Sequence, residues 1–78
     1  MQELIEYIAK SLVDDPTQVV VTQFRRGPQV IISLEVAKED MGRIIGRGGR
    51  VAGAIRTLLR VSAAQEGKRA TLDIVEPD

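Results

Sequence analysis

The stretch Gly42-Arg43-Ile44-Ile45-Gly46-Arg47-Gly48-Gly49-Arg50 interrupts a helical pattern with three glycines in four positions. Apolar residues at helical spacing precede it in 37–45 and resume in 51–62, so we predict two helices joined by the short loop Gly46–Gly49. Glycine permits positive φ and brings backbone N–H groups close to a ligand without an intervening side chain. The second helix starts at about Arg50, which directs its unpaired N–H groups and the positive end of its dipole towards the loop. The loop is therefore predicted to bind an anion.

Three arginines, Arg43, Arg47 and Arg50, surround this loop and favour a phosphodiester backbone as the anion. A P-loop does not fit, because the chain contains no Gly-Lys-Ser or Gly-Lys-Thr. A dinucleotide fingerprint does not fit either, because its final glycine would fall on Val51 and the loop follows a helix rather than a strand. The alternative is a helix–turn–helix corner that needs glycine only for its bend. Three glycines with three arginines around them favour the binding loop.

The elements on either side of the loop indicate an α+β fold. The spacing of apolar residues predicts six elements in the order α-β-β-α-α-β: a helix over 4–13, strands Gln18–Arg25 and Gln29–Val36, helices over 37–45 and 50–66, and a strand Arg69–Val75. The short Gly27-Pro28 connection favours an antiparallel hairpin, and Gly67 is expected at the C-cap of the last helix. We predict two layers, with a three-stranded sheet covered on one face by three helices. The single domain occupies 1–78, and 76–78 are expected to form a frayed tail.

The distribution of charge supports a polyanionic partner, although the net charge of the chain is zero. Residues 1–40 carry four basic and seven acidic side chains, whereas 41–70 carry seven basic side chains and one acidic side chain. A local balance of +6 favours contact with a polyanion. The alternative is a solvated helix face that happens to be rich in arginine.

The composition excludes several classes of function. The chain has no Cys and no His, so zinc ligands, thiol nucleophiles and imidazole bases are missing, and the serines stand in no triad context. We therefore expect neither an enzyme nor a cofactor. No apolar run approaches the roughly 18 residues of a membrane span, and the acidic start does not resemble a signal peptide, so a cytoplasmic protein is expected. Tyr7 and Phe24 are the only aromatic residues, which is too few for the stacking platform of an RRM or cold-shock fold; both are expected in the core or at a sheet edge.

The apolar residues followed by Gly-x-x-Gly at Gly46–Gly49 resemble the signature of the KH domain family. The order of the elements resembles the type II KH arrangement of bacterial proteins, and the resemblance covers nearly the whole chain. The length and the opening helix are similar to the KhpA family of small stand-alone bacterial KH proteins. The signature alone is moderately specific; signature, topology and length together are strongly specific.

The resemblance implies that the loop clamps the backbone of about four nucleotides of single-stranded RNA, with the bases in an apolar groove between the two central helices and the adjacent strand. Gly46 and Gly49 match the two glycines of the signature, and Arg47 and Gly48 match its variable pair. The RNA-binding residues implied in this way are Arg43, Ile44, Ile45, Gly46, Arg47, Gly48, Gly49 and Arg50. The edge of the strand Val30–Val36 is expected to form a wall of the groove, while Ile44 and Ile45 have core packing as the competing role. Arg43 and Arg50 are expected to contact phosphate, because they have few structural duties.

The resemblance further implies an RNA chaperone or post-transcriptional regulator linked to cell-wall synthesis and cell shape. It implies a homodimer, or a heterodimer with a larger KH-containing protein of the KhpB type (also called Jag or EloR). The alternative is a protein-interaction module that uses the KH fold mainly for dimerisation, with weak or no RNA binding. Exposed apolar residues on the helix over 50–66, such as Val61, would favour that alternative.

Overall fold

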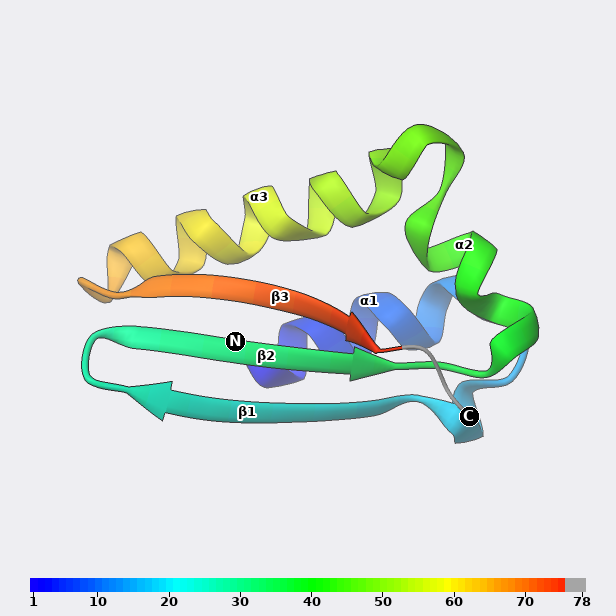
Figure 1. The fold of residues 1–78 in the computed structure, drawn as a ribbon, viewed down its shortest axis with the longest axis horizontal. Helices are drawn as coiled ribbons and strands as arrows, with labels where there is room; N and C mark the ends of the chain where they lie inside the picture. Colours follow the sequence, from blue (N-terminus) through cyan, green and yellow to red (C-terminus); the bar gives the residue numbers. More distant parts are fainter. Residues whose placement is uncertain (76–78) are drawn as a thin grey trace.

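The computed structural model has the predicted order of elements, α-β-β-α-α-β (Figure 1). It describes residues 1–75, with only the backbone at Arg47; the tail predicted at 76–78 lies outside the described residues. The helices are α1 (Gln2–Leu12), α2 (Met41–Ile45) and α3 (Arg50–Gln65), and the strands are β1 (Val20–Arg26), β2 (Gln29–Glu35) and β3 (Arg69–Val75). Short 3₁₀ turns at Pro16–Gln18 and Lys38–Asp40, and a glycine turn at Arg47–Gly49 that is not helical at Gly48, connect them.

The three strands form one sheet in the order β1-β2-β3, with β2 in the centre. β1 and β2 are antiparallel across the predicted hairpin, whereas β2 and β3 are parallel. A parallel pair needs a crossover connection, and the segment that contains α2 and α3 provides it (Figure 1). This crossover places α3 beside β3, which forms one edge of the sheet.

The core lies between the sheet and the helices, which all cover one face (Figure 1). Alternate side chains of a strand point to opposite faces, and Val30, Ile32 and Leu34 of β2 are all fully buried towards the helices. The helices and β3 supply the rest of the buried cluster, chiefly Ile5, Ala9, Ile44, Ile55, Leu59 and Leu72. The predicted α+β fold, with a three-stranded sheet covered on one face, is therefore confirmed.

Some boundaries differ from the predictions. The first strand starts at Val20 rather than Gln18, because Asp15 accepts a hydrogen bond from the backbone N–H of Thr17 and starts a 3₁₀ turn at Pro16–Gln18. The helix predicted over 37–45 is a 3₁₀ turn followed by the short helix α2. Gly67 follows the end of α3 with φ of +68°, as expected. The N–H groups of Gly67 and Lys68 bond back to Ala64 and Ala63, which closes the helix with a Schellman motif.

Asp40 is a buried charged side chain that connects two parts of the chain. It is 2% exposed, and its two carboxylate oxygens accept hydrogen bonds from the backbone N–H groups of Asp14 and Asp15, both at 3.1 Å. The segment that follows α1 is therefore attached to the start of α2. Arg43 adds an ion pair to the same carboxylate, with Nε 3.5 Å from Oδ1.

Candidate nucleic-acid interface

The predicted loop lies between α2 and α3, and Gly46 ends α2 in a conformation that other residues rarely adopt. Its φ of +69° and ψ of −179° fall in a region that is essentially restricted to glycine. Its N–H still bonds to the carbonyl of Gly42 at 2.9 Å. A Cβ at this position would come within 2.5 Å of Cγ2 of Val51 and 3.0 Å of its backbone nitrogen. Gly46 is thus required both by its backbone angles and by the close approach of α3.

The rest of the loop leaves its outer surface open. Gly48 and Gly49 have φ of +61° and +78°, and a Cβ at either position would meet nothing within 4 Å. Gly49 is the N-cap residue of α3, and no side chain caps the N–H groups of the first helical turn. α3 has 16 residues, so the positive end of its dipole adds to the attraction that these N–H groups exert on an anion. This combination of an open surface and uncapped N–H groups suits an anion.

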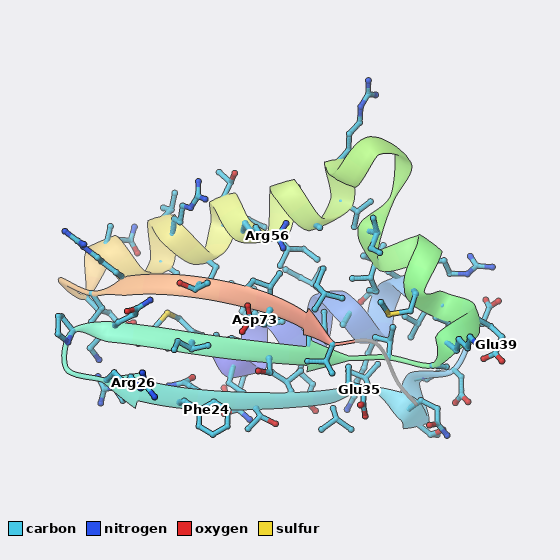
Figure 2. All side chains as sticks on the ribbon, viewed as in Figure 1. Phe24, Arg26, Glu35, Glu39, Arg56 and Asp73 are labelled. Carbon is cyan, nitrogen blue, oxygen red and sulfur yellow. The ribbon has the colours of Figure 1, made fainter. Side chains whose placement is uncertain are left out.

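A groove of about 590 Å³, lined by both apolar and charged side chains, begins at this loop. This volume is within the range of about 300–1,000 Å³ that is typical of ligand sites. α2, the loop, α3 and β3 all contribute to its lining, which consists of Met41, Ile45, Gly49, Ala52, Arg56 and residues 72–75. Arg56 reaches from α3 towards β3, on which Asp73 lies (Figure 2). A ligand held at the loop can therefore place apolar parts between α3 and β3.

The strand beside the groove is β3, and the prediction that the edge of Val30–Val36 would form a wall is wrong. β2 is the central strand, so its helix-facing side chains are enclosed by the core. β3 is the edge strand beside α3, and it exposes Val75 by 40%.

The two isoleucines before the loop have different environments. Ile44 is fully buried in the core cluster, so its side chain has no surface to offer to a ligand and instead fixes the end of α2. Ile45 is 42% exposed and lines the groove. The structure therefore brings Ile45, Gly46, Gly48 and Gly49 together at one surface, with Ile44 beneath it.

The arginines beside the loop also differ. Arg50 opens α3, is exposed, and forms no ion pair with another residue of 1–75. Arg43 bonds to Asp14 at 2.9 Å and to Asp40 at 3.5 Å, so the expectation that it has few structural duties is wrong. These partners lie 29 and 3 residues away in the sequence, and no local sequence pattern predicts the pairing of Arg43 with Asp14. The side chain of Arg47 lies outside the described part of the structure.

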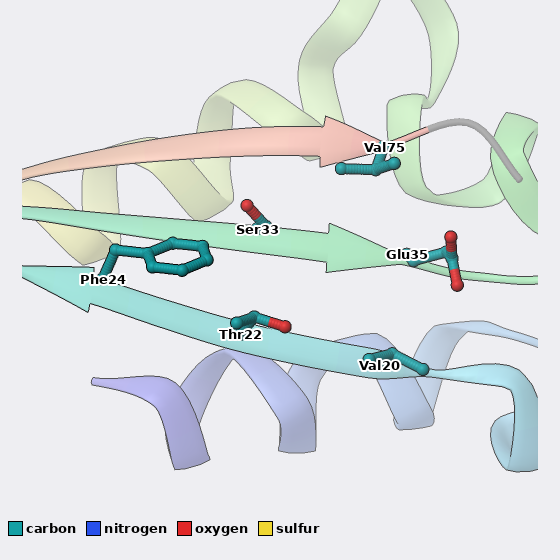
Figure 3. Close-up of a pocket in the computed structure, with 6 residues that line it drawn as sticks. All are labelled: Val20, Thr22, Phe24, Ser33, Glu35 and Val75. Carbon is teal, nitrogen blue, oxygen red and sulfur yellow. The ribbon is translucent and has the colours of Figure 1, made fainter.

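Another hollow lies on the opposite, open face of the sheet. Figure 3 shows its lining, which consists of Val20, Thr22, Phe24, Ser33, Glu35 and Val75. Phe24 is 56% exposed here, and Tyr7 on α1 is 67% exposed, so neither aromatic residue lies in the core. The lining includes one carboxylate and no cation, so this hollow does not suit phosphate as the loop does.

Several residues that line the groove were not predicted as site residues: Met41, Ala52, Arg56 and residues 72–75. In the sequence, Arg56 is one of the seven basic residues of 41–70. Its position at a groove follows only from the structure, because the parallel pairing with β2 places β3 beside α3. Within residues 1–75, no helix is long and apolar enough to cross a membrane.

Comparison with known proteins places this geometry in a family. Residues 2–74 match the family model described as KhpA/KhpB, KH domain. A protein of Clostridium acetobutylicum named RNA-binding protein KhpA is 47% identical over 75 residues, which are 96% of this chain and 100% of the relative. Proteins of the same name from Caldanaerobacter subterraneus and Listeria monocytogenes are 48% and 46% identical, over 96% and 97% of this chain and the full length of each relative. No solved structure gives a significant match to the chain.

Proposed function

The chain belongs to the KhpA/KhpB family of KH domains, and from this premise we propose that it binds single-stranded RNA at the Gly46–Gly49 loop and the adjoining groove. The resemblance to the KH family is thereby confirmed. The named relatives are RNA-binding proteins rather than enzymes, in agreement with the expectation from the composition.

The observation that carries the proposal is the continuity between an open loop suited to an anion and a partly apolar groove. Phosphates bind the open surface of Gly48 and Gly49 and the N–H groups at the start of α3, while the guanidinium of Arg50, which has no ion-pair partner among residues 1–75, pairs with them. The bases then lie against Ile45, Ala52 and the end of β3. KH domains accommodate about four nucleotides in this way. With only one residue of the variable pair carrying a side chain, the affinity of a single site is expected to be modest.

A charge reversal in the loop tests the proposal. The Arg47→Asp, Gly48→Asp variant is expected to bind random-sequence RNA hexamers at least tenfold more weakly than the parent protein, because two carboxylates at the loop repel phosphate. Position 48 is open to a new side chain, and Asp is among the residues that adopt positive φ most readily. Fluorescence anisotropy at a series of salt concentrations measures the affinity, and its salt dependence estimates the number of phosphates bound.

The matched control is Arg47→Asn, Gly48→Asn, which has nearly the same shape but lacks the two negative charges. It is expected to retain most of the affinity, and circular dichroism should show that both variants are folded. Equal binding by the Asp and Asn variants would contradict the proposal, as would the absence of RNA binding by the parent protein.

Two further single substitutions separate binding from folding. Arg50→Gln should weaken hexamer binding about three- to tenfold and leave the melting temperature nearly unchanged, because Arg50 has no partner among residues 1–75. Arg43→Gln should instead lower the stability by about 0.5–1 kcal/mol, the range for partly exposed ion pairs, and weaken binding less. Anisotropy and thermal unfolding measure the two effects, and a larger loss of affinity in Arg43→Gln would show that this arginine leaves Asp14 and Asp40 to bind RNA.

A second function, association with another KH protein, is favoured by an exposed apolar pair on α3. Leu58 and Val61 are 50% and 54% exposed and lie one helical turn apart. We include in the proposal that this surface supports a homodimer or a heterodimer with a larger KhpB-type protein, and that the chain acts in the cytoplasm as an RNA chaperone or regulator connected to cell-wall synthesis and cell shape. If association is instead the main function, a self-complex should persist in high salt and in the Arg47→Asp, Gly48→Asp variant, whereas RNA binding should be weak or absent in the parent.

A further inference from the structure

A row of cations continues from the groove along the line where α3 lies beside β3. Arg56 and Arg60 lie one helical turn apart on α3, and Lys68 and Arg69 lie at the start of β3. We refer to this line, with its four cations, as the α3–β3 seam. It begins beside the groove and ends at the opposite end of the sheet from the glycine loop (Figure 1).

The seam is hollowed along its length, and the hollows share their rims. The hollow next to the groove is lined by Arg56, Leu59, Arg60 and residues 70–72. The last hollow is lined by Arg60, Ala64, Lys68, Gln29 and residues 69–71. Arg56 lines both the groove and the first of these hollows, and Arg60 lines both seam hollows, so the three hollows follow one another along the seam with an arginine at each junction. α3 extends for about 24 Å, so the seam can hold more chain than the loop site alone.

The charges of the seam are not neutralised within the described part of the chain. None of its four cations forms an ion pair among residues 1–75, in contrast to Lys10, which pairs with Glu6. The described linings of the two seam hollows contain no carboxylate, and Asp73 lies only beside the groove. The small side chains of Ala64 and Ala70 leave the last hollow open between the cations. Cations without an ion-pair partner among residues 1–75, on both sides of these hollows, fit the backbone of a polyanion better than they fit an apolar partner.

We propose that the RNA does not end at the four-nucleotide loop site but continues along the α3–β3 seam, where Arg60 and Lys68 contact additional phosphates. This inference rests on the proposed function, because the loop and the groove determine where the strand enters the seam. In this proposal, the excess of basic side chains in 41–70 belongs to one extended RNA-binding site rather than to a solvated helix face.

The test compares random-sequence RNA pools of 6 and 12 nucleotides. A four-nucleotide site has three registers on a hexamer and nine on a dodecamer, so it accounts for a gain of about threefold with length. With the seam engaged, the parent protein should bind the dodecamer pool at least tenfold more tightly than the hexamer pool at low salt. The Arg60→Gln, Lys68→Gln variant should return the gain to about threefold, bind hexamers within about twofold of the parent, and reduce the salt slope on dodecamers by about 1.4 for two lost phosphates.

The matched control is Lys10→Gln, Arg25→Gln, which removes one lysine and one arginine from α1 and β1, away from the seam. It should retain the full gain with length. If hexamers bind but the parent gains only threefold, or if the gain persists in the Arg60→Gln, Lys68→Gln variant, the extended site is overturned while the loop site stands. If neither pool binds the parent protein, the proposed function falls and this inference falls with it.

Discussion

The Asp40→Ala variant is expected to be about 3 kcal/mol less stable than the parent protein, since it removes a buried acceptor of two backbone hydrogen bonds. Hydrogen bonds to a charged group contribute about 1.5–3 kcal/mol each, and unpaired buried donors add a desolvation cost. Alanine leaves the N–H groups of Asp14 and Asp15 without their present acceptor. For a domain of this size the melting temperature should fall by about 12–24 °C. Thermal and urea unfolding monitored by circular dichroism measure the change.

The conservative variant Asp40→Asn distinguishes the lost acceptor from the lost charge. Its amide oxygen can accept one of the two hydrogen bonds, but its NH₂ group faces the other N–H, so a loss of about half that of Asp40→Ala is expected. If both variants unfold within about 0.5 kcal/mol of the parent protein, the link between the segment after α1 and the start of α2 contributes little to the fold.

The link through Asp40 was hidden in the sequence. The residues that it holds are 25 and 26 positions away, and no local pattern identifies a contact at that separation. The elements themselves were predictable, because Val30, Ile32 and Leu34 alternate along β2 and the helical spacing resumes directly after the glycines. Local periodicity thus predicted the layers, but the long-range polar contacts required coordinates.

The candidate site likewise has a part that local sequence patterns predict and a part that only the structure shows. The loop could be predicted because three glycines in four positions restrict the backbone in ways that the sequence itself displays. The wall of the groove could not, since whether β2 or β3 lies beside α3 depends on the order of strands in the sheet. Arg43 and Arg50 look equivalent in the sequence, and only the pairing of Arg43 with Asp14 distinguishes them. Phosphate contact by Arg43 and by Arg50 stays a prediction, which the Arg43→Gln and Arg50→Gln variants compare.

The second large effect is expected for Gly46→Ala, which should cost about 3 kcal/mol. The backbone angles of Gly46 lie in a region that costs other residues about 1–3 kcal/mol, and the new methyl group would overlap Val51, with overpacking of about the same cost. Gly48→Ala is the matched control in the same loop, because its φ is also positive but its surroundings are open; a cost of roughly 1–2 kcal/mol is expected. Urea unfolding of the two variants gives the comparison, and equal losses would show that the contact with Val51 relaxes freely.

A double-mutant cycle separates the two causes at Gly46. Val51→Ala removes the methyl group that would lie 2.5 Å from the new Cβ, although its Cβ and backbone nitrogen remain at 2.9 and 3.0 Å. The combined variant Gly46→Ala, Val51→Ala should therefore be about 1 kcal/mol more stable than the sum of the single losses predicts. Strict additivity would show that the contact with Cγ2 of Val51 adds nothing, and it would leave the cost to the backbone angles of Gly46 and to the approach of the Cβ and backbone nitrogen of Val51.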